Sequence, residues 1–500
     1  MSTRETFERF AQTVRQIGDI KTASSVLQWD QETYMPPHGA EGRGRVLATL
    51  AGQAHEMLTS RELGRLIDEL SEAKDLDARQ AANVREVKRD RERATKVPRD
   101  LVERLSKAAS KGLEVWKHAR STKRFAFFAP DLEKIVDLQR ELAEAYGYKG
   151  HLYDALVEGF EPGARVADLD PLFQELREFL VPLVRAIQDS SHGIDTSILK
   201  GDFPEDRQKK FGLDTIAAIG FDLQAGRVDV SAHPFCSGFS PSDVRLTTRY
   251  SPKDLRPAVF GLLHEAGHGI YEQGLNADER GLPTGQSVSM GIHESQSRLW
   301  ENVVGRSRPF WQKFFPSLES LFSRLFGRNL DDFYRAINAV EPSFIRVEAD
   351  EVTYNLHIIL RYELEKALLT KELAVKDLPG AWNERMKELL GIVPPDDSLG
   401  VLQDVHWAMG AFGYFPTYTL GNLYAAQLFA QAKLEIPTLE KDIAAGRFGP
   451  LRDWLREKVH RNGRLHLPGK LIQEITSQPL TAQFFCDYLR QKYGSLYQLS

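Results

Sequence analysis

Apolar side chains recur at the spacing of an α-helix through most of this 500-residue chain. The clearest run is Leu356, Leu360, Leu364 and Leu368, which stand one turn apart and form a single apolar stripe. Along about the first 200 residues, charged side chains fill the face opposite the apolar one. The pattern predicts a succession of amphipathic helices whose apolar stripes form the core. An early example is the set Phe7, Phe10, Ala11, Val14 and Ile17.

Sequence typical of β-strands is confined to residues 225–250. There, RVDVSAHPF and DVRLTTRY contain short β-branched runs, which Gly238, Pro241 and Ser242 separate. No linker rich in glycine, serine or proline divides the chain, and no repeat of solenoid length is present. We therefore predict an all-α protein with one small β-sheet, built as a single domain over residues 1–500.

The charge balance argues against nucleic acid or a membrane as the partner. The formal net charge of -5 gives no general attraction for phosphate or anionic lipid. The Lys- and Arg-rich stretch over residues 85–124 is interleaved with acidic residues at helical spacing, which favours a solvated helical face. The first residues lack the apolar stretch of a signal peptide, and no segment approaches the ~20 apolar residues of a membrane span. We expect a soluble, cytoplasmic protein.

The chain has two cysteines, Cys236 and Cys486, which stand far apart in the sequence. This excludes a disulfide framework. We interpret both as core or bystander thiols rather than as catalytic nucleophiles.

The most informative string is GLLHEAGHGI, which contains an H-E-x-x-H pattern at His264, Glu265 and His268. In a helix of about 3.6 residues per turn, the two histidines project from one face and can bind one tetrahedral Zn²⁺. Glu265 then stands beside the ion, where its carboxylate can accept a proton from water that attacks a peptide carbonyl. Two surface histidines on a helix are the alternative. Pro257 requires the helix to be kinked or to begin after Ser251.

A catalytic zinc needs a third protein ligand and one open position. Glu294, within SVSMGIHESQSRLWEN, is the candidate, because it opens a second amphipathic segment and completes a set of two histidines and one glutamate. A solvated helix carboxylate is the alternative for Glu294 taken alone. His293 and Arg298 flank it and are candidates for groups that support the ligands or bind substrate.

Six short motifs occur in order along the chain. They are H-P-F at 233–235, D-x-R-x-T at 243–247, H-E-x-x-H at 264–268, H-E-S-Q-S-R at 293–298, I-R-x-x-A-D at 345–350 and G-x-x-Q-D-x-H-W at 400–407. Together they resemble the motifs of the carboxypeptidase Taq family of metallopeptidases. LQWDQETYMPP at 27–37 is similar to the opening of that family, so the likeness covers nearly the whole chain. The sequence departs from the pattern at Ser477, where the family leads us to expect glycine.

The resemblance implies a carboxypeptidase, which must recognise the free α-carboxylate of its substrate. The planar fork of arginine suits this task, and Arg245 and Arg346 are the candidates. The alternatives are a strand-surface charge at Arg245 and an ion pair along a helix between Arg346 and Asp350.

The segment HWAMGAFGYFPTYTLGN contains further polar candidates. His406, Tyr414 and Tyr418 could donate hydrogen bonds to the oxyanion, as similar groups do in related helical zinc peptidases. The alternative for both tyrosines is a core aromatic ring with a satisfied hydroxyl. We predict that His233 is a buried, hydrogen-bonded histidine that supports the substrate site.

The resulting hypothesis is a zinc carboxypeptidase in which His264, His268 and Glu294 hold the metal and Glu265 activates water. Co²⁺ or Mn²⁺ can occupy the same ligands. We expect a helical region over about residues 1–200, the zinc-site region over residues 201–500, and a long cleft between two helical halves. The resemblance also implies broad side-chain tolerance and a homodimer.

Two other hypotheses remain open at this stage. An oligopeptidase that cuts internal bonds would share the zinc site but would not need an anchor for the carboxylate. A catalytically silent helical protein could bind peptides as a chaperone or scaffold, and Glu265 would then be dispensable.

Overall fold

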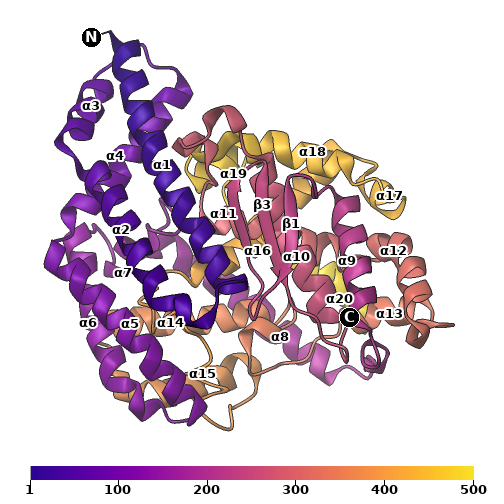
Figure 1. Cartoon of the computed structure of the whole chain (residues 1–500). Helices are drawn as coiled ribbons and strands as arrows, with labels where there is room; N and C mark the ends of the chain where they lie inside the picture. Colours follow the sequence, from indigo (N-terminus) through magenta and orange to yellow (C-terminus); the bar gives the residue numbers. More distant parts are fainter. Residues whose placement is uncertain (1, 500) are drawn as a thin grey trace. The chain divides into compact units, whose positions relative to one another are not determined.

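The structure is a computed structural model that describes residues 2–499, which form helices and one three-stranded sheet (Figure 1). The described chain divides into two compact units, each made of three segments that are far apart in the sequence. The first comprises Met1–Thr95, Asp195–Ile337 and Leu428–Pro479, and the second comprises Lys96–Ile194, Asn338–Gln427 and Leu480–Ser500. The predicted fold class is confirmed. The single catalytic domain and the long cleft stay predictions.

The first unit holds most of the helices and the sheet. Its helices are α1 Thr3–Thr33, α2 Ala40–Thr59, α3 Arg61–Ser71, α4 Ala78–Lys96, α9 Glu205–Ile219, α10 Arg256–Gly274, α11 Met290–Arg298, α12 Arg308–Leu321, α13 Leu330–Ile337, α17 Leu439–Ala444, α18 Gly449–Lys458 and α19 Pro468–Thr476. The apolar stripe predicted near the amino terminus packs as core, because Phe10, Val14 and Ile17 of α1 are buried in one cluster with leucines of α3.

The sheet forms where the sequence predicted it. Its strands are β1 Gly226–Val230, β2 Cys236–Ser240 and β3 Asp243–Thr248, in the order β1-β3-β2. β1 runs parallel to β3, and β2 runs antiparallel to it after a short turn. Val244 and Leu246 of β3 are fully buried, and Leu246 lies against Gly269 of α10. Because side chains alternate along a strand, α10 covers one face of the sheet and Arg245 points to the other.

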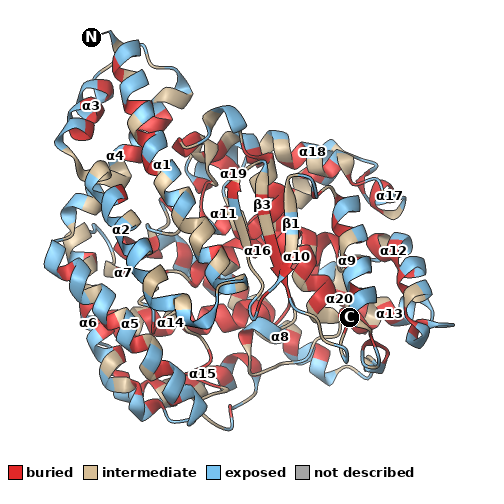
Figure 2. Cartoon of the chain, in the orientation of Figure 1, coloured by how far each residue is buried: buried red, intermediate tan, exposed pale blue. Residues whose placement is uncertain are grey.

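Helix α10 carries the H-E-x-x-H string and is mostly buried (Figure 2). It begins at Arg256, so Pro257 lies in its first turn, where the missing N–H of proline leaves no intrahelical hydrogen bond unmade. Of the two expected outcomes, a kink or a later start, the structure has the later start. α10 packs against β3, α9 and α11, which places the histidines inside the first unit.

The second unit is all helical. Its helices are α5 Arg99–Ser121, α6 Ala129–Tyr146, α7 Leu152–Val157, α8 Val166–Asp189, α14 Tyr354–Thr370, α15 Leu378–Leu390 and α20 Gln483–Tyr497. The helix α16, Pro416–Glu435, crosses from the second unit into the first. α14 packs against α6, α7, α8 and α15. The predicted leucine stripe of α14 is core, since Leu356, Leu360, Leu364 and Leu368 are all buried.

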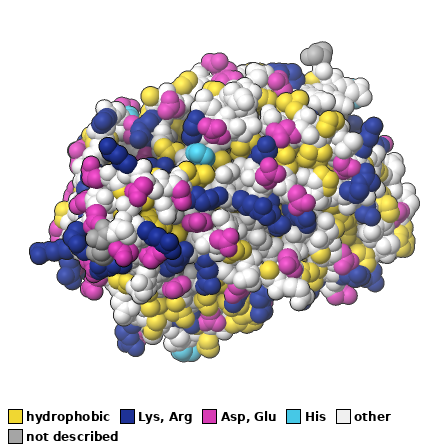
Figure 3. Space-filling view, turned by 90° about the horizontal axis from the view of Figure 1, so that it is seen from above, with side chains coloured by type: hydrophobic (Ala, Val, Ile, Leu, Met, Phe, Trp, Pro, Cys, Tyr) yellow, Lys and Arg dark blue, Asp and Glu magenta, His cyan; other side chains and the backbone are white. Residues whose placement is uncertain are grey.

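Several charged side chains of the stretch over residues 85–124 pair along a helix as predicted, although Glu86 is buried and pairs with Arg85 and Arg89. On the face that Figure 3 shows, cationic and anionic side chains are interspersed. In the stretch over residues 85–124, Arg99 pairs with Glu103, and Arg104 pairs with Asp100, one helical turn apart. Both cysteines are free, and Cys486 is buried. Within residues 2–499, no helix combines the length and the apolar character that a membrane crossing requires.

Ser477 ends α19 in an unusual backbone conformation. Its φ of 62° and ψ of 13° lie in the left-handed region, which glycine adopts readily and residues with a Cβ adopt at a cost. The position where the sequence departs from the family pattern is therefore a helix C-cap, and the departure has a conformational cost.

We predict that Ser477→Gly raises the free energy of unfolding by about 1 kcal/mol, because it relieves the strain of a Cβ in the left-handed region. The measurement is the midpoint of urea unfolding. Ser317→Gly is the matched control, because Ser317 is exposed inside α12 of the same unit and loses about 0.5 kcal/mol of helix propensity. A lower midpoint for Ser477→Gly would contradict the prediction.

Candidate metal centre

Three predicted ligands converge in the first unit. His264 and His268 lie one turn apart on α10, and Glu294 lies on α11. Glu294 Oε2 is 3.8 Å from His264 Nε2 and 3.6 Å from His268 Nε2, and one ligand atom from each of the three residues lies within 4.8 Å of the others. A tetrahedral zinc site with bonds of about 2.0–2.1 Å separates its ligand atoms by about 3.4 Å. The three side chains therefore fit one metal ion with little movement.

The other nitrogen of each imidazole is already engaged. His264 Nδ1 lies 2.8 Å from Glu301 Oε2, and His268 Nδ1 lies 3.0 Å from the carbonyl oxygen of His293. Both partners are acceptors, so each Nδ1 carries the proton and donates it. This selects the tautomer whose Nε2 lone pair is free to bind a metal.

Glu294 is held in place by its own helix. Arg298 Nε donates to Glu294 Oε1 at 2.7 Å, and the hydroxyl of Ser297 donates to Oε2 at 3.3 Å. Oε2 is also the oxygen that faces the two histidines. The carboxylate is nearly buried, and these donors offset the cost of removing its charge from water.

A short π-helix continues α11 and carries Glu301. This segment, Leu299–Val304, follows α11 directly, and Arg298 Nη1 lies 3.3 Å from Glu301 Oε2. Burial works to raise the pKa of Glu301, but the nearby guanidinium of Arg298 and the bond from His264 outweigh it, so that the pKa falls to about 2. Glu301 is therefore an ionised acceptor for His264. π-helical turns often occur at functional sites.

Glycine at position 267 allows α10 and α11 to approach each other. A Cβ at this position would lie 2.5 Å from the carbonyl oxygen of Gln296 and 2.7 Å from Cα of Ser297. Contacts this short do not occur for real side chains, so any larger residue would push the helices apart. Because Gln296 and Ser297 follow Glu294 on α11, Gly267 helps to determine how near Glu294 comes to the histidines.

Glu265 lies beside the three candidate ligands and is not one of the converging set. It is 6% exposed, and burial raises the pKa of its carboxyl to about 7. Among residues 2–499, no hydrogen-bond partner is present for this carboxylate. A buried acid that is free to exchange a proton suits general-base chemistry.

His293 packs against His268 and is partly buried. Its Nε2 is 2.8 Å from Glu272 Oε1, its carbonyl accepts from His268, and the two rings stack at 4.4 Å between centroids. Its contacts are those of a residue that supports the ligand His268.

Arg245 lies on β3, on the sheet face away from α10. Its Nε and Nη2 each donate to an oxygen of Asp243 at 3.0 Å. The guanidinium carbon is 4.3 Å from the ring centroid of Trp29 and 5.0 Å from that of Phe239. Two aromatic rings and one carboxylate therefore hold the guanidinium of Arg245 in place. A charged side chain on the open surface of a strand would be less ordered.

Arg346 is buried in the second unit and does not pair with Asp350. Its Nε and Nη2 donate to Asp404 Oδ1 at 3.0 and 2.9 Å, and Nη1 donates to the hydroxyl of Tyr354 at 2.9 Å. Asp350 instead accepts from the backbone N–H groups of Val352 and Thr353. The alternative of a helical Arg346–Asp350 pair is therefore wrong, because Arg346 opens a short 3₁₀ turn that ends at Glu348 and Asp350 lies beyond it, so the two do not share an α-helix.

The three polar candidates of the next motif lie together in the second unit. His406 Nε2 is 3.1 Å from the hydroxyl of Tyr418, and the Tyr414 ring lies 5.5 Å from the His406 ring. Burial lowers the pKa of His406 to about 4 despite the nearby carboxylate of Asp404. The imidazole is therefore neutral at pH 7 and carries one N–H donor.

His233 is exposed, which corrects the prediction that it is a buried histidine. It precedes β2, and its carbonyl oxygen accepts a hydrogen bond from the hydroxyl of Ser231 at 2.6 Å. The backbone of this residue is therefore held while its imidazole faces solvent. A position next to Pro234 in an irregular segment gave no periodicity from which burial could be judged.

Two residues that bond to the candidates, Glu301 and Asp404, were not predicted from the sequence. Glu301 could have been found, because it follows Glu294 by two helical turns and so lies on the same face. Asp404 stands within the G-x-x-Q-D-x-H-W motif, but its pairing with Arg346 joins segments far apart in sequence. Spacing carries no signal for such a contact.

Comparison with known proteins agrees with the geometry. The family model described as carboxypeptidase Taq (M32) metallopeptidase matches residues 9–493. The chain is 44% identical to thermostable carboxypeptidase 1 of Thermus thermophilus, with 99% of this chain and 100% of that protein aligned. It is 40% identical to carboxypeptidase 1 of Bacillus subtilis, with 99% of each covered. The crystal structure of M32 carboxypeptidase from Deinococcus radiodurans superposes with a TM-score of 0.96 at 40% identity, over 99% of this chain and 100% of that one.

We predict that the protein binds about one zinc ion per chain, and that His268→Ala and Glu294→Ala each abolish this binding. Glu301→Gln keeps the three ligands but weakens the acceptor for His264, so metal affinity falls about 10- to 100-fold. The measurement is metal content by mass spectrometry after dialysis against graded chelator. His38→Ala, an exposed histidine of the first unit, is the control and retains the metal. Full metal content in Glu294→Ala would contradict the ligand assignment.

Proposed function

The chain belongs to the carboxypeptidase Taq (M32) family of metallopeptidases and is a metallocarboxypeptidase, and we propose that His264, His268 and Glu294 hold its catalytic metal. The observation that carries this proposal is the convergence of the three ligand atoms within 4.8 Å. We propose zinc as the metal, because two imidazoles and one carboxylate are the ligand set of many hydrolytic zinc sites. Co²⁺ or Mn²⁺ are alternatives for the same ligands.

A zinc ion held by these three residues would supply a Lewis acid and would lower the pKa of a water molecule, so that the water loses a proton more readily and becomes a better nucleophile. We propose that Glu265 accepts the proton of the attacking water and returns it to the leaving amine. Its burial and the lack of another partner among the described residues support this role. Glu301 and Arg298 act on the ligands: Glu301 orients His264, and Arg298 orients Glu294. We therefore propose that Arg298 supports a metal ligand, and substrate binding is the second candidate role for this residue.

The groups that stabilise the oxyanion and hold the substrate are also proposals. We propose His406, Tyr414 and Tyr418 as donors to the oxyanion; the neutral state of His406 and its contact with Tyr418 support this. We propose Arg245 and Arg346 as the arginines that recognise the α-carboxylate, since each is held rigidly by an aspartate. His233 is a further candidate for substrate binding, because its imidazole is exposed.

The remaining proposals concern the protein's surroundings. We propose peptides with a free C-terminal carboxylate as substrates, accepted with broad side-chain tolerance, and a homodimer, as the family resemblance implies. We propose a cytoplasmic location, because both cysteines are free, as is usual in a reducing compartment.

We predict that the metal-loaded protein shortens a mixed peptide from its carboxyl end, one residue at a time. The same peptide with an amidated C-terminus is expected to be cut at least 100-fold more slowly, because its end lacks the carboxylate that arginine recognises. Product masses followed with time make the measurement. Fragments from the middle of the peptide, or equal cleavage of the amide, would instead identify an oligopeptidase.

We predict that Glu265→Gln lowers kcat by about 10²- to 10⁴-fold while metal content stays unchanged, because the amide cannot accept a proton. Steady-state kinetics and metal analysis on the same preparation provide the measurement. Glu56→Gln is the control and is expected to keep kcat, since Glu56 is an exposed carboxylate on α2 of the same unit. Unchanged turnover in Glu265→Gln would favour a catalytically silent protein that binds peptides.

A further inference from the structure

The loop that carries His406, residues 404–413, is held on both sides of this residue by two buried ionisable side chains of one helix. Arg361 and Glu365 lie one turn apart on α14, and both are 0% exposed. Arg361 contacts the loop before His406, and Glu365 contacts it after His406. Neither residue was among the candidates predicted from the sequence.

Arg361 anchors the loop through Asp404. Its Nε donates to Asp404 Oδ2 at 2.6 Å, while Arg346 occupies the other oxygen, Oδ1. Arg361 Nη1 donates to the carbonyl of His357 on the same helix, and its guanidinium lies 4.6 Å from the Trp382 ring centroid. The two guanidiniums hold the pKa of Asp404 well below its usual range, so the carboxylate stays ionised. Asp404 precedes His406 by two residues, so this ion pair places the start of the loop.

Glu365 anchors the other end of the loop. Its Oε1 accepts from the indole Nε1 of Trp407 at 2.9 Å. Its Oε2 accepts from the backbone N–H of Gly413 at 3.1 Å and from the hydroxyl of Tyr153 at 2.6 Å. All three partners are donors, so only an acceptor at both oxygens satisfies them. Trp407 is the neighbour of His406, and Gly413 ends the loop.

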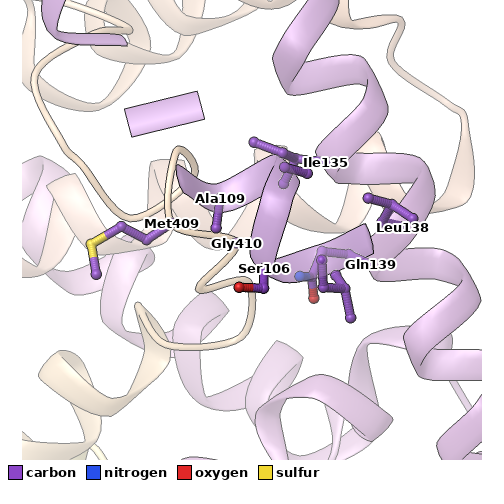
Figure 4. Close-up of a pocket in the computed structure, with 9 residues that line it drawn as sticks. Ser106, Ala109, Ile135, Leu138, Gln139, Met409 and Gly410 are labelled. Carbon is purple, nitrogen blue, oxygen red and sulfur yellow. The ribbon is translucent and has the colours of Figure 1, made fainter. Parts of the chain in front are cut away.

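The middle of this loop is loosely packed, although Ala408 and Phe412 are buried. Met409 and Gly410 border a cavity of about 230 Å³, whose other walls are side chains of α5 and α6 (Figure 4). Met409 is 56% exposed. The His406 ring packs against Phe415 and makes one hydrogen bond, to Tyr418. Its buried Nδ1 lies 3.9 Å from Asp404 Oδ1 and has no hydrogen-bond partner within residues 2–499. The middle of the loop therefore has room to shift, and the polar contacts at Asp404, Trp407 and Gly413 hold the loop on both sides of it.

We propose that Arg361 and Glu365 are positioning residues that hold the His406 loop in the geometry needed for the reaction. The kinetic part of this proposal rests on the proposed function, in which His406 donates to the oxyanion. The structural part, which concerns only where the imidazole of His406 lies, does not rest on the proposed function. The experiment therefore reads the two parts separately.

The first readout is the imidazole of His406, observed by NMR with ¹³C-labelled histidine in the metal-loaded protein. The chain has 13 histidines, so each resonance can be resolved, and His406→Asn identifies the relevant one. Glu365→Gln replaces one accepting oxygen with an NH₂ group that faces a donor, so a hydrogen bond to the carboxylate is lost. The His406 resonance is therefore expected to shift or broaden. In the control Glu161→Gln, a buried glutamate of the same unit, which accepts a hydrogen bond from Tyr424 of α16, changes in the same way. There the resonance is expected to stay in place.

The second readout is kinetic. Glu365→Gln is expected to lower kcat about 10- to 100-fold with little change in KM, because a displaced donor weakens binding of the transition state and not of the substrate. Arg361→Met is expected to do the same, and Arg361→Lys to recover part of the loss by restoring a charge beside Asp404. Glu161→Gln is expected to keep kcat. Circular dichroism confirms that each variant is folded.

A double-mutant cycle with His406→Ala connects the readouts. If Glu365 acts through His406, the Glu365→Gln loss in kcat disappears in the His406→Ala background. Additive losses would overturn the proposal, and so would an unshifted His406 resonance in a folded Glu365→Gln protein. If His406→Ala alone keeps full kcat, the proposed role of His406 fails, while the resonance shift still decides whether Glu365 positions it.

Discussion

The contact between α10 and α11 at Gly267 is the constraint on which the metal centre depends. The two histidines can be placed by helix geometry alone, but a third ligand must come from another element. Without a Cβ at position 267, the backbone of α11 can lie directly on α10, which brings Glu294 to the histidines. Every other part of the centre follows from that approach, including the bonds of Glu301 and of the His293 carbonyl to the imidazoles.

Both units pair buried carboxylates with arginines, which offsets the cost of removing the carboxylates from water. In the first unit, the guanidinium of Arg298 donates hydrogen bonds to both Glu294 and Glu301. In the second, Asp404 is shared by Arg346 and Arg361. A buried charge that loses its partner is strongly destabilising, so such networks hold their members in one arrangement. Side chains fixed in this way can act on a reaction without first being ordered by the substrate.

Much of the fold and of the candidate site was predictable, for reasons that differ between residues. The leucine stripe of α14, the sheet over residues 226–248 and the helical phase of His264 and His268 all depend on local periodicity. Ser477 was singled out only by its departure from the family pattern, and the structure shows that the position is a left-handed C-cap. The exposure of His233 was mispredicted, since an irregular segment carries no period from which burial could be judged.

The sequence by itself determined the fold class, the pair of imidazoles on one helix face and, through its ordered motifs, the family of metallopeptidases. These features depend on neighbours within one or two helical turns, or on matching short strings. Only the tertiary structure decided that Glu294 reaches the histidines, that Arg346 pairs with Asp404 rather than with Asp350, and that Glu365 holds the loop of His406. Each of these contacts joins residues from different elements, and how closely those elements approach is determined by side-chain volume and buried charge, which spacing along the chain does not record.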